Sequence, residues 1–427
     1  MKQFFNRLRN LSSTKEVRQK FLFTLGVFLV FRLLAHIPVP GVDVTQLRTL
    51  FDSSQFLSLL NIFSGGTLAN FSIVAVGINP YITASIVMQL ATMVFPNLKE
   101  LQKDGESGRE RINQYTRLIA VPLAVVQSLT VLTLLRSANL LQTIDPFSVI
   151  VLIATLVAGS MILMWLGELV TEYGIGNGIS MVLLAGIVSQ LPAGIAQLAA
   201  VTSSQQVLTL SASAAVFLAV IALVVFMNEA VRKVQIQYAK RVRGSKMIGG
   251  QSTHLPIKVN VTGVLPIIFA LTIMIAPPFL ARLMLTSGIP ALTDWGQRIS
   301  LWFLPTSPVY VTLYFLIVVV FTIVSSMIFF NAGDIADELK KSGAFVPGIR
   351  PGGPTKKHLQ FVVSRITIVG ALFLGMIAIL PSLAQAATGI QSLAIGGTSV
   401  LIVVSVILET AKQVQGMTVG QNYEQYL

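Results

Sequence analysis

The stretch LLNIFSGGTLANFSIVAVGINPYITASIVMQLATMVFP, residues 59–96, is apolar almost throughout, yet it does not read as one membrane helix. Its second part, residues 78–95, is long enough to span a bilayer core of about 30 Å at a rise of about 1.5 Å per residue. The first part, residues 61–76, is interrupted by Gly65 and Gly66 and carries no charge. Such a segment avoids water either as a re-entrant or interfacial piece or by burial inside the protein.

The composition of the whole chain is that of a multi-pass membrane protein. Of its 427 residues, 54% are hydrophobic and only 11% are charged, and the mean hydropathy is +0.77. An ordinary soluble protein carries about 25% charged residues. The apolar residues form ten blocks that are suitable for spanning helices. These predicted spans cover residues 21–37, 78–95, 118–135, 147–166, 179–201, 210–227, 262–285, 309–330, 366–383 and 393–408.

The positive charge indicates how the chain is threaded. The formal net charge is +13, and Lys and Arg gather in alternate segments outside the predicted spans. Because basic residues mark the cytoplasmic side, both termini are predicted to be cytoplasmic. Two cytoplasmic loops, residues 228–260 and 331–360, are longer than topology requires. In the first loop, the alternation of residues 234–238 predicts a strand, and residues 243–246 predict the turn of a hairpin.

The ten spans divide into two sets of five, in residues 1–200 and 201–427. An odd number of helices in each half reverses the orientation of the second half, so the division is compatible with an inverted repeat. The sequences of the two halves show no convincing similarity, and the repeat rests on the helix count alone.

The spans offer little chemistry. No Asp or Glu lies near an apparent midplane, which argues against an ion-coupled secondary transporter, the main alternative function for this architecture. Arg32 lies late in the first span, where its side chain can reach the interface. The absence of cysteine excludes disulfides and thiolate metal sites. The histidines lack metal-ligand spacing, and residues 174–178, GIGNG, are interpreted as a tight connection between helices. We therefore expect no catalytic residue, metal or cofactor, and no enzymatic activity.

The basic residues of the first cytoplasmic loop allow two interpretations. One is a topological anchor that also contacts anionic lipid. The other is a docking site for an RNA-rich or acidic partner that uses phosphate contacts. Seven cations on one hairpin-like projection favour docking.

Several phrases of the sequence are specific enough to indicate a family. In chain order they are NIFSGGTLANFSI, GINPYI, DGESGRERINQYTR, MWLGELVTEYGIGNGIS, QSTHLPIKVNVTGVLPIIFA, LKKSGAFVPGIRPG and GGTSVLIVV. The chain resembles the SecY family of bacterial protein-conducting channels over essentially its whole length. The resemblance implies an all-α polytopic membrane protein, with ten transmembrane helices in two pseudo-symmetric five-helix halves around a central pore that a short plug helix closes.

The resemblance also implies which residues form the channel. The pore constriction falls on Ile78, Ile82, Ile179, Leu183, Ile268 and Ile402. The plug falls on Asn61, Ile62, Phe63, Ser64, Gly65, Gly66, Thr67, Leu68, Ala69, Asn70 and Phe71. The lateral gate lies between the second and seventh spans, and we infer that Thr83, Gln89 and Asn260 hold it shut. Glycines 65, 66 and 77 predict a hinge between the plug and the second span.

Function, partners and location follow from the same resemblance. The chain is expected to pass unfolded secretory polypeptides across the bacterial plasma (inner) membrane and to release hydrophobic segments laterally into lipid. The expected partners are SecE and SecG subunits, the SecA motor ATPase, the ribosome through its rRNA, signal sequences, nascent chains and membrane lipids. The expected docking residues are Arg232, Lys233, Lys240, Arg241, Arg243, Lys246 and Arg350.

Overall fold

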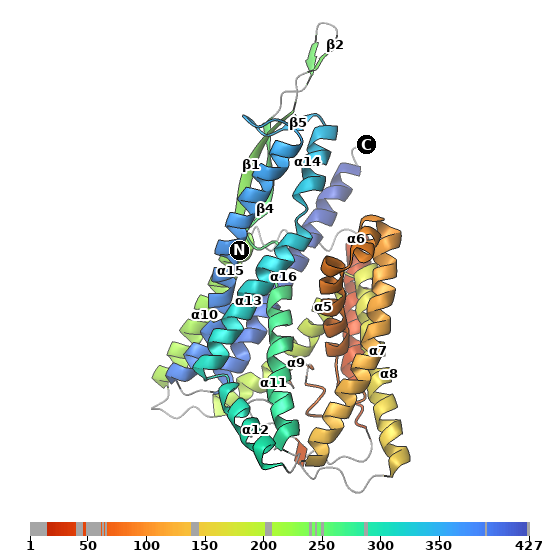
Figure 1. Ribbon diagram of the computed structural model, residues 1–427, viewed down its shortest axis with the longest axis vertical. Coiled ribbons are helices and arrows are strands. Elements are labelled where there is room, and N and C mark those ends of the chain that lie inside the picture. Colours follow the sequence, from red (N-terminus) through yellow and green to blue (C-terminus); the bar gives the residue numbers. More distant parts are fainter. Residues whose placement is uncertain are drawn as a thin grey trace.

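A computed structural model shows a helix at each predicted span (Figure 1). The structure describes residues 15–39, 46–47, 61, 64, 66–137, 145–200, 207–238, 241–243, 246–248, 252–285, 289–388 and 391–424. The first five spans are α2 (Lys15–Leu34), α5 (Asn79–Val94), α7 (Glu106–Ser137), α8 (Pro146–Tyr173) and α9 (Gly178–Ala200). The other five are α10 (Val207–Glu229), α11 (Leu265–Leu285), α13 (Pro308–Phe329), α15 (Gly353–Thr388) and α16 (Gln391–Glu424).

Several of these helices can cross a membrane by themselves. Among the described residues, five helices are long and apolar enough to do so, judged by length and composition. A sixth crossing results if α5 is counted together with α6 (Pro96–Lys103), to which it is bent by 107°. The bend falls where Phe95 is extended, since a residue that precedes proline is driven out of the helical region. The chain is therefore a multi-pass membrane protein.

The two halves of the chain form two groups of packed helices (Figure 1). In the first half, α7 packs on α5 and α8, and α8 packs on α2 and α9. In the second half, α15 packs on α13 and α16, α10 packs on α16, and α11 packs on α13. Contacts between the groups are made by α5 with α11, by α9 with α16 and by α2 with α16. The short helix α12 (Pro290–Trp302) packs on α11.

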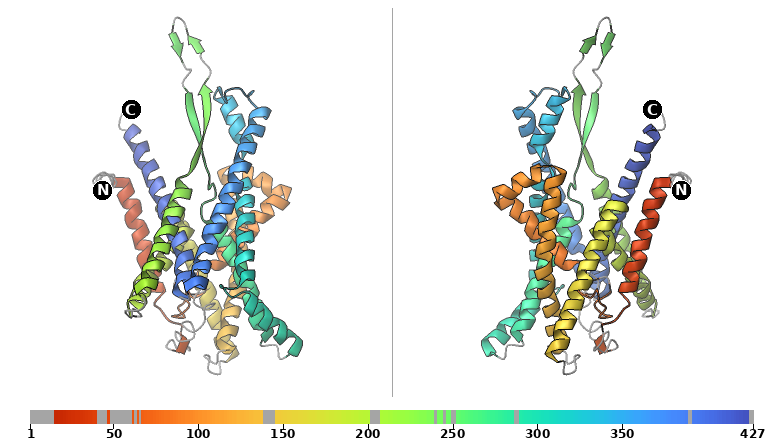
Figure 2. Two further views of the ribbon diagram at one scale, coloured as in Figure 1. Left: turned by 90° about the vertical axis from the view of Figure 1, so that its left-hand side faces the viewer. Right: turned by 90° about the vertical axis from the view of Figure 1, so that its right-hand side faces the viewer.

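A small sheet projects beyond the helices at one end of the molecule (Figure 2). Strand β1 (Val231–Tyr238) pairs antiparallel with β4 (Ser252–Lys258) and with β5 (Ala344–Phe345), in the order β4-β1-β5. At the tip, β2 (Arg241–Arg243) pairs with β3 (Lys246–Ile248). The predicted strand and hairpin are therefore confirmed. Their extension by β5 into a three-stranded sheet was not predicted.

The sheet joins the two long loops that were predicted to be cytoplasmic. Tyr238 of the first loop pairs with Ala344 of the second. Val234 of β1 belongs to one buried apolar cluster with Ala332, at the start of α14 (Ala332–Lys341), and Leu359 of α15. The two ends of the described chain lie on the side of the molecule from which this sheet projects (Figure 2). The two loops, residues 228–260 and 331–360, therefore form one body, which we call the loop domain.

Candidate pore and plug

The six predicted constriction residues lie on one continuous apolar cluster at the contact between the two helix groups. They are Ile78 and Ile82 at the start of α5, Ile179 and Leu183 at the start of α9, Ile268 of α11 and Ile402 of α16. Five of them are buried, and Ile179 is half-buried against the same cluster. The six residues thus share one apolar core, although the first and the last are more than 300 residues apart in the sequence.

The connection between α8 and α9 sets the position of Ile179. Asn177 caps α9, because its Oδ1 accepts a hydrogen bond from the backbone N–H of Ile179 at 3.1 Å. The Thr171 hydroxyl accepts from the backbone N–H of Gly178 at 2.9 Å and donates to the carbonyl oxygen of Gly167 at 3.0 Å. The glycine-rich stretch is thus a tight helix connection, as predicted.

Replacing Gly178 by alanine is expected to destabilise the protein. A Cβ at this position would overlap the carbonyl oxygen of Gly167, so α8 and α9 would have to separate. Overpacking of this kind costs about 1–3 kcal/mol. Thermal unfolding in detergent micelles measures the loss. Gly26→Ala in α2 is the matched control, since no atom lies within 4 Å of its Cβ position. Equal melting temperatures for the two variants would contradict the close approach.

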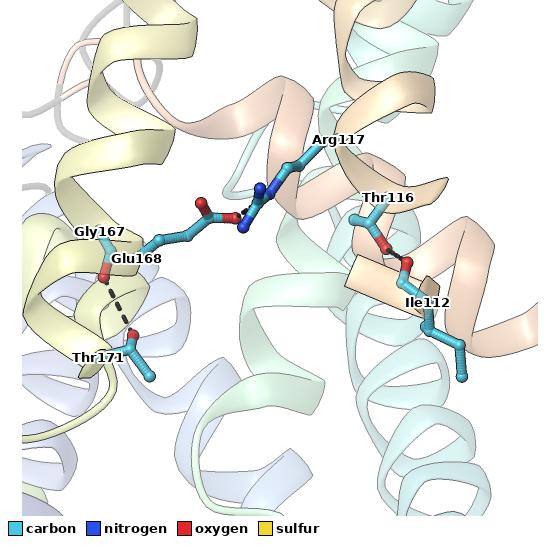
Figure 3. A network of polar contacts seen from close by, with 6 residues as sticks. All are labelled: Ile112, Thr116, Arg117, Gly167, Glu168 and Thr171. Carbon is cyan, nitrogen blue, oxygen red and sulfur yellow. Dashed lines mark hydrogen bonds and ion pairs between the residues drawn. The ribbon is translucent and has the colours of Figure 1, made fainter. Parts of the chain in front are cut away.

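An ion pair joins α7 to α8 beside this connection (Figure 3). The Nε of Arg117 donates to Oε1 of Glu168 at 2.7 Å, and the side chains are 48% and 22% exposed. Ion pairs this exposed contribute only about 0–1 kcal/mol, so the pair orients the two helices more than it stabilises them. The sequence places Glu168 near a helix end but gives no sign of this partner.

The predicted plug segment is held together by its own polar side chains. Asn61 is helical, and residues 66–71 form turns, while Ile62, Phe63 and Gly65 lie outside the described residues. The Asn61 Oδ1 accepts from the backbone N–H of Ala69 at 2.9 Å. This bond satisfies a backbone N–H group that the turns would otherwise leave unpaired.

The plug segment also contacts the wall of the apolar cluster. The Gln190 side chain of α9 donates from Nε2 to the carbonyl oxygen of Asn61 at 3.2 Å. Gly66 lies directly under the same amide, and a Cβ there would stand 3.0 Å from Nε2. Thr67 and Phe71 are fully buried. The segment is therefore packed inside the protein, one of the alternatives that its sequence leaves open.

The end of the plug segment is pinned to the chain that follows α2. The backbone N–H of Val39 donates to the carbonyl oxygen of Phe71 at 2.9 Å. Two residues further on, the N–H of Ile73 donates to the carbonyl oxygen of Ile37 at 3.0 Å. The chain that follows α2 and the chain that leaves the plug segment therefore lie side by side.

The link from the plug to α5 is fixed by α8. The Ser160 hydroxyl donates to the carbonyl oxygen of Gly77 at 2.9 Å. Gly159 lets the chains approach so closely that a Cβ there would overlap the carbonyl oxygen of Ile73. Gly77 has a φ of +69°, which favours glycine, but it forms a held turn. Movement at Gly77 would have to break the bond to Ser160, and the hinge stays a prediction.

The polar residues predicted at the lateral gate do not join its two helices by hydrogen bonds of their side chains in the part of the chain that the structure describes. Helices α5 and α11 do pack on each other. The Thr83 hydroxyl donates to the carbonyl oxygen of Asn79 in its own helix, at 3.0 Å, and Gln89 is half-buried. The Asn260 side chain is buried before α11 and donates to Oδ1 of Asn228 at 3.0 Å. Their role as gate latches stays a prediction.

The predicted docking residues lie on the loop domain. Arg232 and Lys233 are exposed on β1, and Arg350 is exposed in the turn before α15. Residues 241, 243 and 246 lie at the hairpin tip, where Arg241 and Arg243 belong to β2 and Lys246 to β3. Lys240 lies outside the described residues. The structure thus brings the basic residues of both loops to one end of the molecule.

Sequence reasoning missed the contacts that fix the plug and the connections. Ser160, Gly159 and Gln190 were not singled out, although a Gly-Ser pair within an apolar span is a visible signal of close packing. Among the described residues, no group of three or more His, Cys, Asp or Glu side chains is placed to hold a metal ion.

The fold and the central aliphatic cluster define an α-helical membrane channel. The SecY family model matches residues 72–411, and the chain belongs to this family. It is 44% identical to the protein translocase subunit SecY of Vibrio cholerae, over 97% of this chain and 95% of the relative. SecY is a channel family, so the alternative of a secondary transporter is not supported.

Two solved channels share the fold. One is a SecY structure with a plug domain that stabilises the closed channel and maintains a membrane seal. Its TM-score is 0.66 at 18% identity, over 93% of this chain and 92% of that one. The other is Sec61 in the canine ribosome–channel complex of the endoplasmic reticulum, with a TM-score of 0.60 at 16% identity and the same coverage of 93% and 92%. The fold with ten helices and a plug is therefore shared with SecY and Sec61 channels.

Proposed function

We propose that this chain is the channel-forming subunit of a protein translocase that passes unfolded secretory polypeptides across the bacterial plasma membrane. The observation that supports the proposal is that the six candidate constriction residues, from four helices, all belong to or pack on one buried apolar cluster. The loop domain and both termini face the cytoplasm, which agrees with the distribution of Lys and Arg.

The aliphatic constriction explains how such a channel conducts a polypeptide and resists ions. Isoleucine and leucine side chains provide no oxygen atoms to replace the hydration shell of an ion, and a narrow apolar constriction resists wetting. The same side chains adapt to an extended peptide of arbitrary sequence because they make only non-directional contacts.

Hydrophobic segments leave the channel sideways, between α5 and α11. These helices belong to different halves of the chain and pack directly on each other. Transfer of apolar side chains from the channel to lipid is favourable by about 0.8 kcal/mol for each CH₂ group that leaves water. Signal sequences and membrane-spanning segments of nascent chains are therefore the segments released.

The loop domain docks the partners that drive transport. Its exposed basic residues suit the phosphates of ribosomal RNA and the acidic surface of the SecA motor, and SecE and SecG complete the complex in the membrane. The chain itself requires no cofactor and has no enzymatic activity, so the energy comes from translation or from the motor.

Crosslinking of a stalled secretory chain tests the channel. The protein contains no cysteine, so Ile82→Cys and Ile402→Cys each create a unique thiol. Both are expected to crosslink to a thiol-reactive probe in the stalled chain at least about tenfold faster than a thiol outside the pore, because proximity raises the effective concentration.

Two variants on the outer helix surfaces are the matched controls. Leu118 of α7 and Val369 of α15 are 72% and 65% exposed, so Leu118→Cys and Val369→Cys should face away from the pore. Equal crosslinking at the two central and the two outer positions would refute the proposed path.

A further inference from the structure

A polar junction lies where the hairpin meets the membrane helices. It consists of Asn228 and Glu229 at the end of α10, Asn260 before α11, and Ser405 and Lys412 of α16. Strand β1 begins directly after α10, and β4 runs back to Asn260. The junction therefore closes the base of the hairpin.

Hydrogen bonds connect the three segments that meet at the junction, namely the end of α10, the residues before α11, and α16. The Asn228 side chain donates to the Ser405 hydroxyl at 3.0 Å, which joins α10 to α16. The Asn260 side chain donates to Oδ1 of Asn228 and to the carbonyl oxygen of Gly263, both at 3.0 Å. Asn260 is only 8% exposed. Buried amides with several partners fix the geometry of a contact, because each lost partner leaves a polar group unpaired.

Lys412 adds a second, more accessible connection. Its Nζ donates to the backbone carbonyl oxygen of Asn228 and forms an ion pair with Oε1 of Glu229, both at 2.9 Å. Ser405 and Lys412 are seven residues apart, which places them on the same face of α16 two turns apart. One face of α16 is therefore attached to the end of α10 at two points, through Ser405 and through Lys412.

Two candidate constriction residues lie close to the junction along the chain. Ile402 precedes Ser405 by three residues, about one turn of α16. Ile268 follows Gly263 by five residues and lies in the first turn of α11. A displacement of the hairpin base thus has a short path to α11 and α16, which contribute these residues to the apolar cluster.

We infer that the polar junction couples docking at the hairpin to the constriction, with Lys412 and Asn260 as positioning residues. The inference rests on the proposed function and goes beyond it, because it assigns a route from the docking surface to the pore. Asn260, which was expected to latch the gate, acts in this view by holding α11 to the base of the hairpin.

Thiol accessibility at the constriction tests the coupling in the full-length chain in lipid nanodiscs. Ile402→Cys is the reporter, and its reaction with a small water-soluble maleimide is timed with and without empty ribosomes. Ribosomes are expected to accelerate the reaction. Lys412→Met should reduce this acceleration by about fivefold or more, within the usual range of coupling between sites, and leave the reaction rate without ribosomes unchanged.

Further variants separate coupling from simple stability. Lys412→Arg should retain the acceleration, because the guanidinium can reach the same two oxygen atoms. Lys20→Met is the matched control, since Lys20 makes an exposed ion pair within α2, with Glu16. Asn260→Ala should also reduce the acceleration by ribosomes. Ribosome affinity, measured by co-sedimentation, should stay within about twofold in all variants, because none removes a docking residue.

Three results would overturn the inference. The first is an undiminished acceleration in Lys412→Met and Asn260→Ala. The second is faster reaction without ribosomes in Lys412→Met, which would make the junction a structural brace only. The third is loss of ribosome binding together with the acceleration. If ribosomes fail to bind even the reference protein, the proposed docking function itself is refuted, and with it any coupling to ribosomes.

Discussion

Removing residues 61–71 is expected to raise the resting ion conductance of the reconstituted channel by about tenfold or more. In the proposed channel, the plug segment covers the constriction, whose resistance depends on staying dry, because a narrow apolar pore conducts ions once water fills it. Asn61 ties the segment to α9 through Gln190, and Phe71 is fully buried in a second apolar cluster with residues of α7 and α8. Single-channel recording in planar bilayers measures the conductance.

A point variant provides a graded comparison for the deletion. Asn61→Ala removes the side-chain acceptor for the Ala69 N–H but leaves the segment in place. Its conductance should lie between those of the intact channel and the deletion. Unchanged conductance of the deleted channel, in protein that unfolds at the same temperature as the intact chain, would show that residues 61–71 are not the seal.

Replacing Arg350 by glutamate is expected to lower motor-driven transport by about tenfold or more, which corresponds to about 1.4 kcal/mol of lost interaction. The backbone around Arg350 is fixed, since its carbonyl oxygen accepts from the Thr355 hydroxyl at 2.8 Å and the Ile349 N–H donates to Val346 at 3.0 Å. The exposed side chain is thus presented in a defined direction, so charge reversal opposes an acidic partner at a set place.

Comparing two transport reactions shows whether the effect is specific. Motor-driven transport of a secretory protein into vesicles should fall much more than ribosome-coupled insertion of a membrane protein. Lys341→Glu, on the exposed last turn of α14, makes the same charge change elsewhere on the loop domain and is the control. Equal losses in both reactions for Arg350→Glu would indicate misfolding.

Much of the architecture could be predicted because membrane insertion imposes a strong, local signal on the sequence. Each spanning helix needs about twenty apolar residues, and the charge pattern then orders the helices across the bilayer. The candidate constriction residues came from the resemblance to the family, and local spacing only supports them, since Ile78 and Ile82 are four residues apart and share a helix face.

The contacts that local patterns could not reveal are pairings between distant parts of the chain. Strand β5 has only two residues, and it exists because it can pair with Tyr238 about a hundred residues earlier. Asn260 lies close enough to α11 in sequence to suggest a gate latch, yet its partner is Asn228 on the other side of the hairpin. Gly77 was predicted to be a hinge from its residue type, and no local pattern shows that the hydroxyl of Ser160 donates to its carbonyl oxygen.

The backbone pairing of Val39 with Phe71 and the bond from Ser160 to Gly77 both lie between the candidate plug and α5. We therefore expect a displacement of the plug segment to leave the start of α5 in place. In the proposed channel, opening of the pore and separation of α5 from α11 are then expected to be independent events, so a substrate could cause one without the other.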